Sequence, residues 1–137
     1  TLGDTTGMAT PASVRALYGR MARETPEVTP VAHFHDTRGT GLVNYVAALD
    51  AGVRYFDCAF GGVGGHPAKV RYGGGHTGNV ATEDLVNLFE SMGVRTGLDL
   101  QALPAVSQRC QDVLGRALHS RVAQSGFNPL IAAAGGV

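Results

Sequence analysis

The sequence predicts an α/β fold in which parallel strands alternate with crossover helices. Short apolar stretches rich in β-branched residues alternate with stretches whose apolar residues recur at helical spacing. The expected strands begin about 25–30 residues apart, which is roughly the length of one strand–helix unit. Apolar residues make up 44% of the 137 residues, so the chain is able to bury a core.

Strand and helix patterns follow one another in a regular order. A strand ends near residue 4, and a helix begins at Thr10-Pro11, because Thr caps a helix and Pro suits its first position. The other expected elements are a strand at 30–36, a helix at 42–51 closed by Gly52, a strand at 53–60, a helix capped at Thr82 and closed by Gly93, and a last helix at 103–117. An open doubly wound sheet and part of a (β/α)8 barrel both fit this order.

Charge and cysteine content exclude several classes of protein. Eleven basic residues balance eleven acidic ones, which argues against nucleic acid or an anionic membrane as the main partner. The apolar tail at 129–137 is shorter than the roughly 18 residues that a membrane helix needs. Two cysteines, Cys58 and Cys110, do not make a disulfide framework, so we expect a reducing, cytoplasmic location.

His33 and His35 are the sharpest local signal. Residues two apart in a strand point to the same face, so the two imidazoles lie side by side near the carboxyl end of a strand, where they either share a metal ion or are unrelated polar residues. Asp36 either orients a histidine or begins the loop. Asn79 is either a turn residue or an oxygen ligand, and imidazoles combined with oxygen ligands favour Mg²⁺ or Mn²⁺.

The glycine-rich stretch is the second signal. Eight of the twenty glycines lie between Gly61 and Gly78, which indicates either an active-site lid or a connector. His66 within it is either a general acid or base or a loop residue without a role. Asp4 ends the first strand, where an acid either faces a site or caps a turn.

Taken together, these motifs resemble one family. The motifs are Leu-Gly-Asp-Thr-Thr-Gly-Met-Ala-Thr-Pro at 2–11, His-Phe-His-Asp-Thr-Arg-Gly at 33–39, Gly-Gly-Val-Gly-Gly-His-Pro at 61–67 and Gly-Asn-Val-Ala-Thr-Glu-Asp-Leu at 78–85. Their order and spacing resemble the 3-hydroxy-3-methylglutaryl-CoA lyase family over roughly residues 1–125. The resemblance implies the C-terminal part of a (β/α)8 TIM barrel, with a partial catalytic domain at 1–125 and a tail at 126–137.

By this resemblance, His33, His35 and Asn79 match the metal-binding positions of the family, and His66 and Asp4 match catalytic ones. Substrate binding is expected at Thr5, Gly64 and Gly65. His66 stands where the family has a cysteine, and about four extra residues follow before Asn79. The histidine therefore either takes over proton transfer, or marks a different substrate or the loss of lyase activity.

The implied activity is a metal-dependent carbon–carbon lyase that cleaves an acyl-CoA resembling 3-hydroxy-3-methylglutaryl-CoA to acetyl-CoA and a keto acid, as in leucine degradation. The implied cofactor is Mg²⁺ or Mn²⁺, and the full-length protein is expected to be a homo-oligomer, cytoplasmic or, in a eukaryote, mitochondrial. A condensing acyltransferase of the same superfamily is one alternative, which Asp36-Thr37 after the histidines disfavours. An inactive fragment or subunit is the other, because about three of eight strand–helix units are present.

Overall fold

The computed structural model describes residues 1–64 and 78–134. The chain divides into two compact units, the first comprising residues 1–58 and 64–80 and the second comprising 59–63 and 81 onward. The first unit holds the sheet, and the second holds the later helices. None of the described helices is both long enough and apolar enough to cross a membrane.

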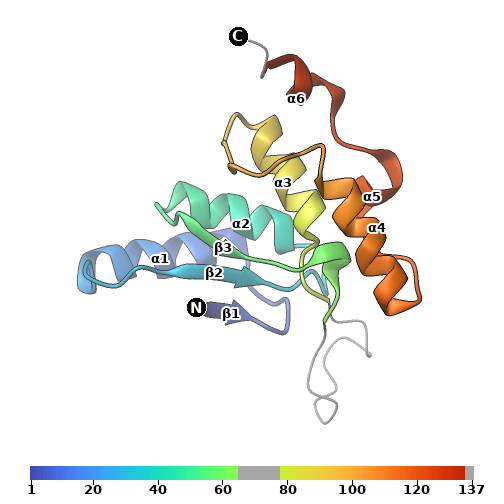
Figure 1. Ribbon diagram of the computed structural model, residues 1–137. Coiled ribbons are helices and arrows are strands. Elements are labelled where there is room, and N and C mark those ends of the chain that lie inside the picture. The colour runs from blue at the N-terminus through green and yellow to red at the C-terminus, as the bar shows by residue number, and fades with distance from the viewer. Residues whose placement is uncertain (65–77, 135–137) are drawn as a thin grey trace. The chain divides into compact units, whose positions relative to one another are not determined.

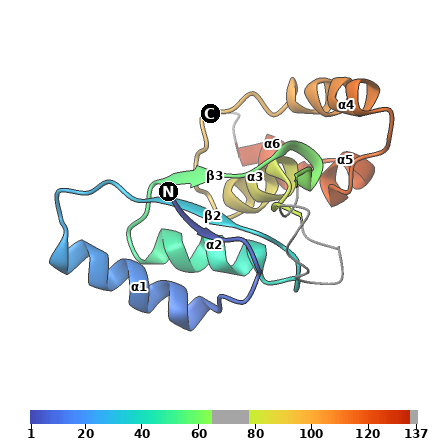
Figure 2. The ribbon, with the colours of Figure 1, turned by 90° about the horizontal axis from the view of Figure 1, so that it is seen from below.

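The first unit is a three-stranded parallel sheet with two helices. Its elements are β1 (Leu2–Asp4), α1 (Pro11–Glu24), β2 (Val31–Phe34), α2 (Gly41–Asp50) and β3 (Tyr55–Asp57). The strands lie in the order β1-β2-β3, and both pairs are parallel. Both helices lie on the same side of the strands (Figure 2). The predicted α/β class with parallel strands and crossover helices is confirmed.

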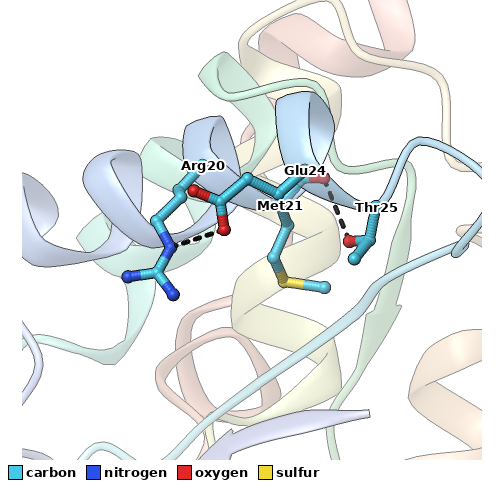
Figure 3. Close-up of polar contacts among 4 residues, drawn as sticks. All are labelled: Arg20, Met21, Glu24 and Thr25. Atoms are coloured by element: carbon cyan, nitrogen blue, oxygen red, sulfur yellow. Dashed lines mark hydrogen bonds and ion pairs between the residues drawn. The ribbon is translucent and has the colours of Figure 1, made fainter.

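The start of α1 lies where the sequence predicted it, and side chains cap both ends. Thr10 caps the helix, because its hydroxyl accepts from the N–H of Ser13 while the Ser13 side chain accepts from the N–H of Thr10. At the other end, the Thr25 hydroxyl donates to the carbonyl of Met21 (Figure 3). Arg20 and Glu24 form an exposed ion pair one turn apart, with 3.0 Å between Nε and Oε2. Such a pair contributes about 0.3–0.5 kcal/mol.

The core of this unit lies between the sheet and the two helices. Ala32 and Phe34 of β2 are buried, as are Tyr18 of α1 and Tyr45 of α2. Because side chains alternate along a strand, Ala32 and Phe34 face the helices and His33 between them faces the opposite side of the sheet. The apolar alternation of β2 thus decides which face carries the candidate site.

The region after β3 differs from the expectation of a strand at 53–60. The strand ends at Asp57, and a short 3-10 helix, η1 (Phe60–Gly62), follows. Gly61 adopts a positive φ of 57°, and a Cβ atom there would lie 2.4 Å from Cβ of Leu118. The chain therefore turns at η1, where Gly61 is left-handed and lies against Leu118, and the strand is shorter than predicted.

The second unit is helical around a buried carboxylate. Its helices are α3 (Thr82–Ser91), α4 (Leu103–Leu114), α5 (Arg121–Ser125) and α6 (Pro129–Ala134), as Figure 1 shows. Glu83 is 1% exposed, and its two oxygens accept from the N–H of Gly61 at 2.8 Å and from the hydroxyl of Ser107 at 2.6 Å. The Asp84 carboxylate accepts from the hydroxyl of Ser120 and from two backbone N–H groups at the start of α5.

Three details of this unit correct the expectations. The cap of α3 is Ala81 rather than Thr82, which is already helical. The last long helix ends at Leu114, because Gly115 turns left-handed with a φ of 63°. Two short helices, α5 and α6, follow where no element was predicted beyond residue 117, and α6 lies within the expected tail.

Among the described glycines of the first unit, Gly41 leaves the least room for a side chain. A Cβ atom at this position would lie 2.3 Å from Cγ2 of Val80 and 2.9 Å from Oδ1 of Asp36. The start of α2 therefore approaches the segment before α3 more closely than any side chain would allow.

We predict that Gly41→Ala lowers the free energy of unfolding by about 1–3 kcal/mol, because the methyl group overlaps Val80. Gly19→Ala, inside α1, is the matched control. A Cβ atom there would lie 3.7 Å from the Arg23 guanidinium, an ordinary contact, so this change is expected to be neutral or to stabilise by about 0.4–1 kcal/mol. Urea unfolding of both variants measures the difference, and equal midpoints would contradict the prediction.

Candidate functional site

The two histidines of the sequence motif lie side by side. His33 belongs to β2, and His35 follows one residue after the end of that strand. Their ring centroids are 5.2 Å apart, with an edge-to-face angle of 71°. His35 is 4% exposed, so its ring is fixed by its surroundings. The strand periodicity correctly predicted this pairing.

Asn79 is brought to the same place by backbone hydrogen bonds. The N–H of Asp36 donates to the carbonyl of Gly78 at 2.9 Å, and the N–H of Val80 donates to the carbonyl of Phe34 at 3.3 Å. His35 and Asn79 consequently form an isolated antiparallel bridge. The three residues predicted to bind metal are therefore gathered at the carboxyl end of β2.

Gly64 lies against Asn79. It has a positive φ of 99°, and a Cβ atom at this position would lie 2.7 Å from Nδ2 of Asn79. A glycine is required here both by the backbone conformation and by this close approach. Gly64 was predicted as a substrate-binding position, and that role stays a prediction. Gly65 and His66 lie outside the described residues.

Asp57 is a candidate residue that the sequence did not single out. It ends β3 and is the register partner of His33. Oδ2 of Asp57 lies 3.3 Å from Nδ1 of His33, which is ion-pair distance. The two groups are not aligned well enough for a hydrogen bond, and Nδ1 has no hydrogen-bond partner among the described residues. The register of two strands far apart in sequence creates this contact, so no local motif indicates it.

Tyr45 holds together the two strands that carry these residues. Its side chain is fully buried, and its hydroxyl accepts from the N–H of Phe34 at 3.1 Å and donates to the carbonyl of Asp57. The rings of Phe34 and Phe56 pack against it edge to face. Burial raises the pKa of the Tyr45 hydroxyl well above its ordinary value, so the hydroxyl stays protonated and remains a donor.

Asp4 and Asp36 each hold a loop. Both oxygens of Asp4 accept hydrogen bonds from its own loop, including one from the N–H of Ala9 at 2.7 Å. Its register partner is Phe34, and its backbone carbonyl accepts from the N–H of His35 at 3.3 Å. The catalytic role expected for Asp4 stays a prediction, as does substrate binding by Thr5 in the same loop. Asp36 accepts from the N–H of Gly41 at 2.8 Å, which favours its role as a loop residue.

The side chains of His33, His35 and Asn79 fit part of a binding site for a hard divalent cation. Two imidazoles and an amide are donors suited to an octahedral ion. Within residues 1–64 and 78–134, no three His, Cys, Asp or Glu side chains cluster closely enough to hold a metal. His33, His35 and Asn79 therefore represent an incomplete ligand set, and water, substrate or other protein groups would have to complete it.

A model of the HMGL-like family matches residues 1–110 of the chain. The chain is 47% identical over 125 residues to the (R)-citramalyl-CoA lyase of Chloroflexus aurantiacus, which covers 91% of the chain and 38% of that protein. It is 41% identical over 120 residues to a hydroxymethylglutaryl-CoA lyase of Bacillus subtilis, which covers 88% of the chain and 39% of the relative.

The chain is also similar to solved structures of lyases from this family. An HMG-CoA lyase of Acinetobacter baumannii, in complex with coenzyme A and 3-methylmalate, matches with a TM-score of 0.81 and 43% identity, over 93% of this chain and 41% of the other. A hydroxymethylglutaryl-CoA lyase of Pseudomonas aeruginosa matches with a TM-score of 0.80 and 40% identity, over 96% and 41%. The chain thus spans about two fifths of the length of these relatives.

We predict that Tyr45→Phe lowers the free energy of unfolding by about 1–3 kcal/mol, because it leaves the buried N–H of Phe34 without its partner and removes the hydrogen bond to the part-buried carbonyl of Asp57. Tyr18→Phe is the matched control, since the buried Tyr18 hydroxyl has no hydrogen-bond partner among the described residues. Thermal unfolding of the two variants checks this. An equal change in both would show that the Tyr45 hydroxyl does not hold the strands.

Proposed function

Because the chain belongs to the HMGL-like family, we propose that it forms part of a divalent-metal-dependent lyase that cleaves a carbon–carbon bond in a 3-hydroxyacyl-CoA. The observation that carries this proposal is the gathering of His33, His35 and Asn79 at the carboxyl end of β2. The carboxyl ends of parallel barrel strands are where enzymes of this architecture place their active sites.

Each residue has a role that follows from its chemistry. His33, His35 and the amide of Asn79 would hold Mg²⁺ or Mn²⁺. A bound divalent cation would act as a Lewis acid on the oxygens of the substrate. Gly64 keeps the backbone close to Asn79, which fixes where the amide lies.

The reaction itself needs two proton movements. A base removes the proton of the substrate hydroxyl, the carbon–carbon bond breaks, and its electron pair forms the enolate of the CoA thioester. His66 then donates a proton to the carbon of that enolate, giving acetyl-CoA. A keto acid is the other product, and it is acetoacetate if the substrate is 3-hydroxy-3-methylglutaryl-CoA.

Two substrates are favoured by the relatives. One is 3-hydroxy-3-methylglutaryl-CoA and the other is citramalyl-CoA, which is the substrate named for the Chloroflexus relative. They share a tertiary alcohol next to the bond that breaks, so the same site chemistry serves both. The assay with both thioesters decides between them.

The first test is an assay of the full-length polypeptide with both thioesters, with and without added Mg²⁺ or Mn²⁺. We expect acetyl-CoA release that depends on the cation. His33→Ala is expected to weaken Mn²⁺ binding by more than about 100-fold, since removing even an indirect contact costs about 10–100-fold. His119→Ala is the matched control, because His119 is an exposed histidine outside the candidate site. Mn²⁺ affinity unchanged by His33→Ala would refute the metal assignment, and absence of cleavage would refute the activity.

The second test concerns His66 in the glycine-rich segment. We expect His66→Ala to lower kcat by about 10²–10⁴-fold, the usual contribution of a general acid or base, with a smaller effect on KM. His66→Cys is expected to recover part of the loss, because a thiol also titrates near neutrality. His76→Ala, in the same segment, is the control. Full turnover by His66→Ala would remove His66 from the mechanism.

A further inference from the structure

Three residues form a row across the face of the sheet that carries the site. In the register of the strands, Gly3 of β1 lies beside His33 of β2, and His33 lies beside Asp57 of β3. Residues directly across parallel strands point to the same face of a sheet. His33 is therefore flanked by a residue with no side chain on one side and by an acid on the other.

The glycine leaves room for the imidazole ring. A Cβ atom at position 3 would lie 3.3 Å from Cδ2 of His33, which is tighter than an ordinary contact. The ring therefore occupies space that any other residue at this position would restrict. On the opposite side, Oδ2 of Asp57 lies 3.3 Å from Nδ1.

The backbone position of Asp57 is fixed by a contact with the core. The carbonyl of Asp57 accepts from the hydroxyl of Tyr45, which also binds the N–H of Phe34 next to His33. One buried side chain thus sets the spacing between the backbone that carries the acid and the backbone that carries the imidazole. The carboxylate itself is about half exposed, and the His33 side chain is 21% exposed.

We propose that Asp57 is a positioning residue for His33, whose carboxylate accepts the Nδ1 proton and so leaves the Nε2 lone pair for a divalent cation. A neutral imidazole carries one proton and one lone pair, and the hydrogen bond made by one nitrogen decides which nitrogen is available to a metal. The two groups already lie 3.3 Å apart, within ion-pair distance. This inference rests on the proposed metal-dependent function.

The first measurement is Mn²⁺ affinity in the full-length polypeptide, by titration followed with electron paramagnetic resonance. Asp57→Ala is expected to weaken binding about 10–100-fold. Asp57→Asn keeps an oxygen acceptor and is expected to lose less. Asp50→Ala is the matched control, because the Asp50 side chain is as exposed as that of Asp57 and also pairs with a basic side chain, Arg15. The control is expected to stay within about twofold of the parent.

The second measurement does not involve the metal. The nitrogen-15 chemical shifts of the His33 ring, recorded in the metal-free protein at a pH where the imidazole is neutral, report its tautomer. We expect the Nδ1–H form in the parent and a shift toward the Nε2–H form in Asp57→Ala. A residue that only stabilises the fold would not move this equilibrium.

The two measurements separate the possible failures. Parent-like Mn²⁺ affinity and tautomer in Asp57→Ala would overturn the inference while leaving the metal site intact. Unchanged Mn²⁺ affinity in His33→Ala would instead overturn the proposed metal site. The ring tautomer alone would then show whether the Asp57 carboxylate accepts the Nδ1 proton of His33. If Asp57→Ala does not fold, Asp57→Asn carries both measurements, and parent-like values in that variant would overturn the inference.

Discussion

The geometry of the candidate site depends on the two hydrogen bonds of the Tyr45 hydroxyl. Where the ladder between β2 and β3 ends, this one group accepts from the buried N–H of Phe34 and donates to the part-buried carbonyl of Asp57, so both backbone groups have a partner. His33 and His35 flank Phe34 in the sequence. A contact on the helix-facing side of the sheet therefore sets the geometry of groups on the opposite side.

Acidic side chains at the carboxyl ends of the strands divide into two kinds. Asp4 accepts hydrogen bonds from backbone N–H groups of the loop that follows it, and Asp36 accepts from the N–H of Gly41 at the start of α2, which shapes the loops between. Asp57 instead faces an imidazole. Position after a strand does not by itself distinguish an acid that folds a loop from one that serves a site, because both follow the same local pattern. The distinction comes from the register of the neighbouring strand.

The fold class and the pairing of the two histidines could be predicted from sequence because they rest on local periodicity, whereas the metal-binding role of His33, His35 and Asn79 stays a prediction. The capping of α1 by Thr10 and the common face of His33 and His35 both follow from residues close in the chain. The contact of Asp57 could not be predicted, since it joins residues 24 positions apart through strand register. The cap of α3 was misassigned because Thr82, a good capping residue, follows the true cap Ala81.

The close approach of Gly41 and Val80 has an evolutionary consequence. A side chain at position 41 would occupy space that Val80 fills, so the cost of enlarging residue 41 depends on the residue at 80. A larger residue at 41 is expected to cost less stability in a background that carries a smaller residue than valine at 80. The order in which substitutions accumulate at these two positions is therefore biased by packing next to Asn79 rather than by the chemistry of the site.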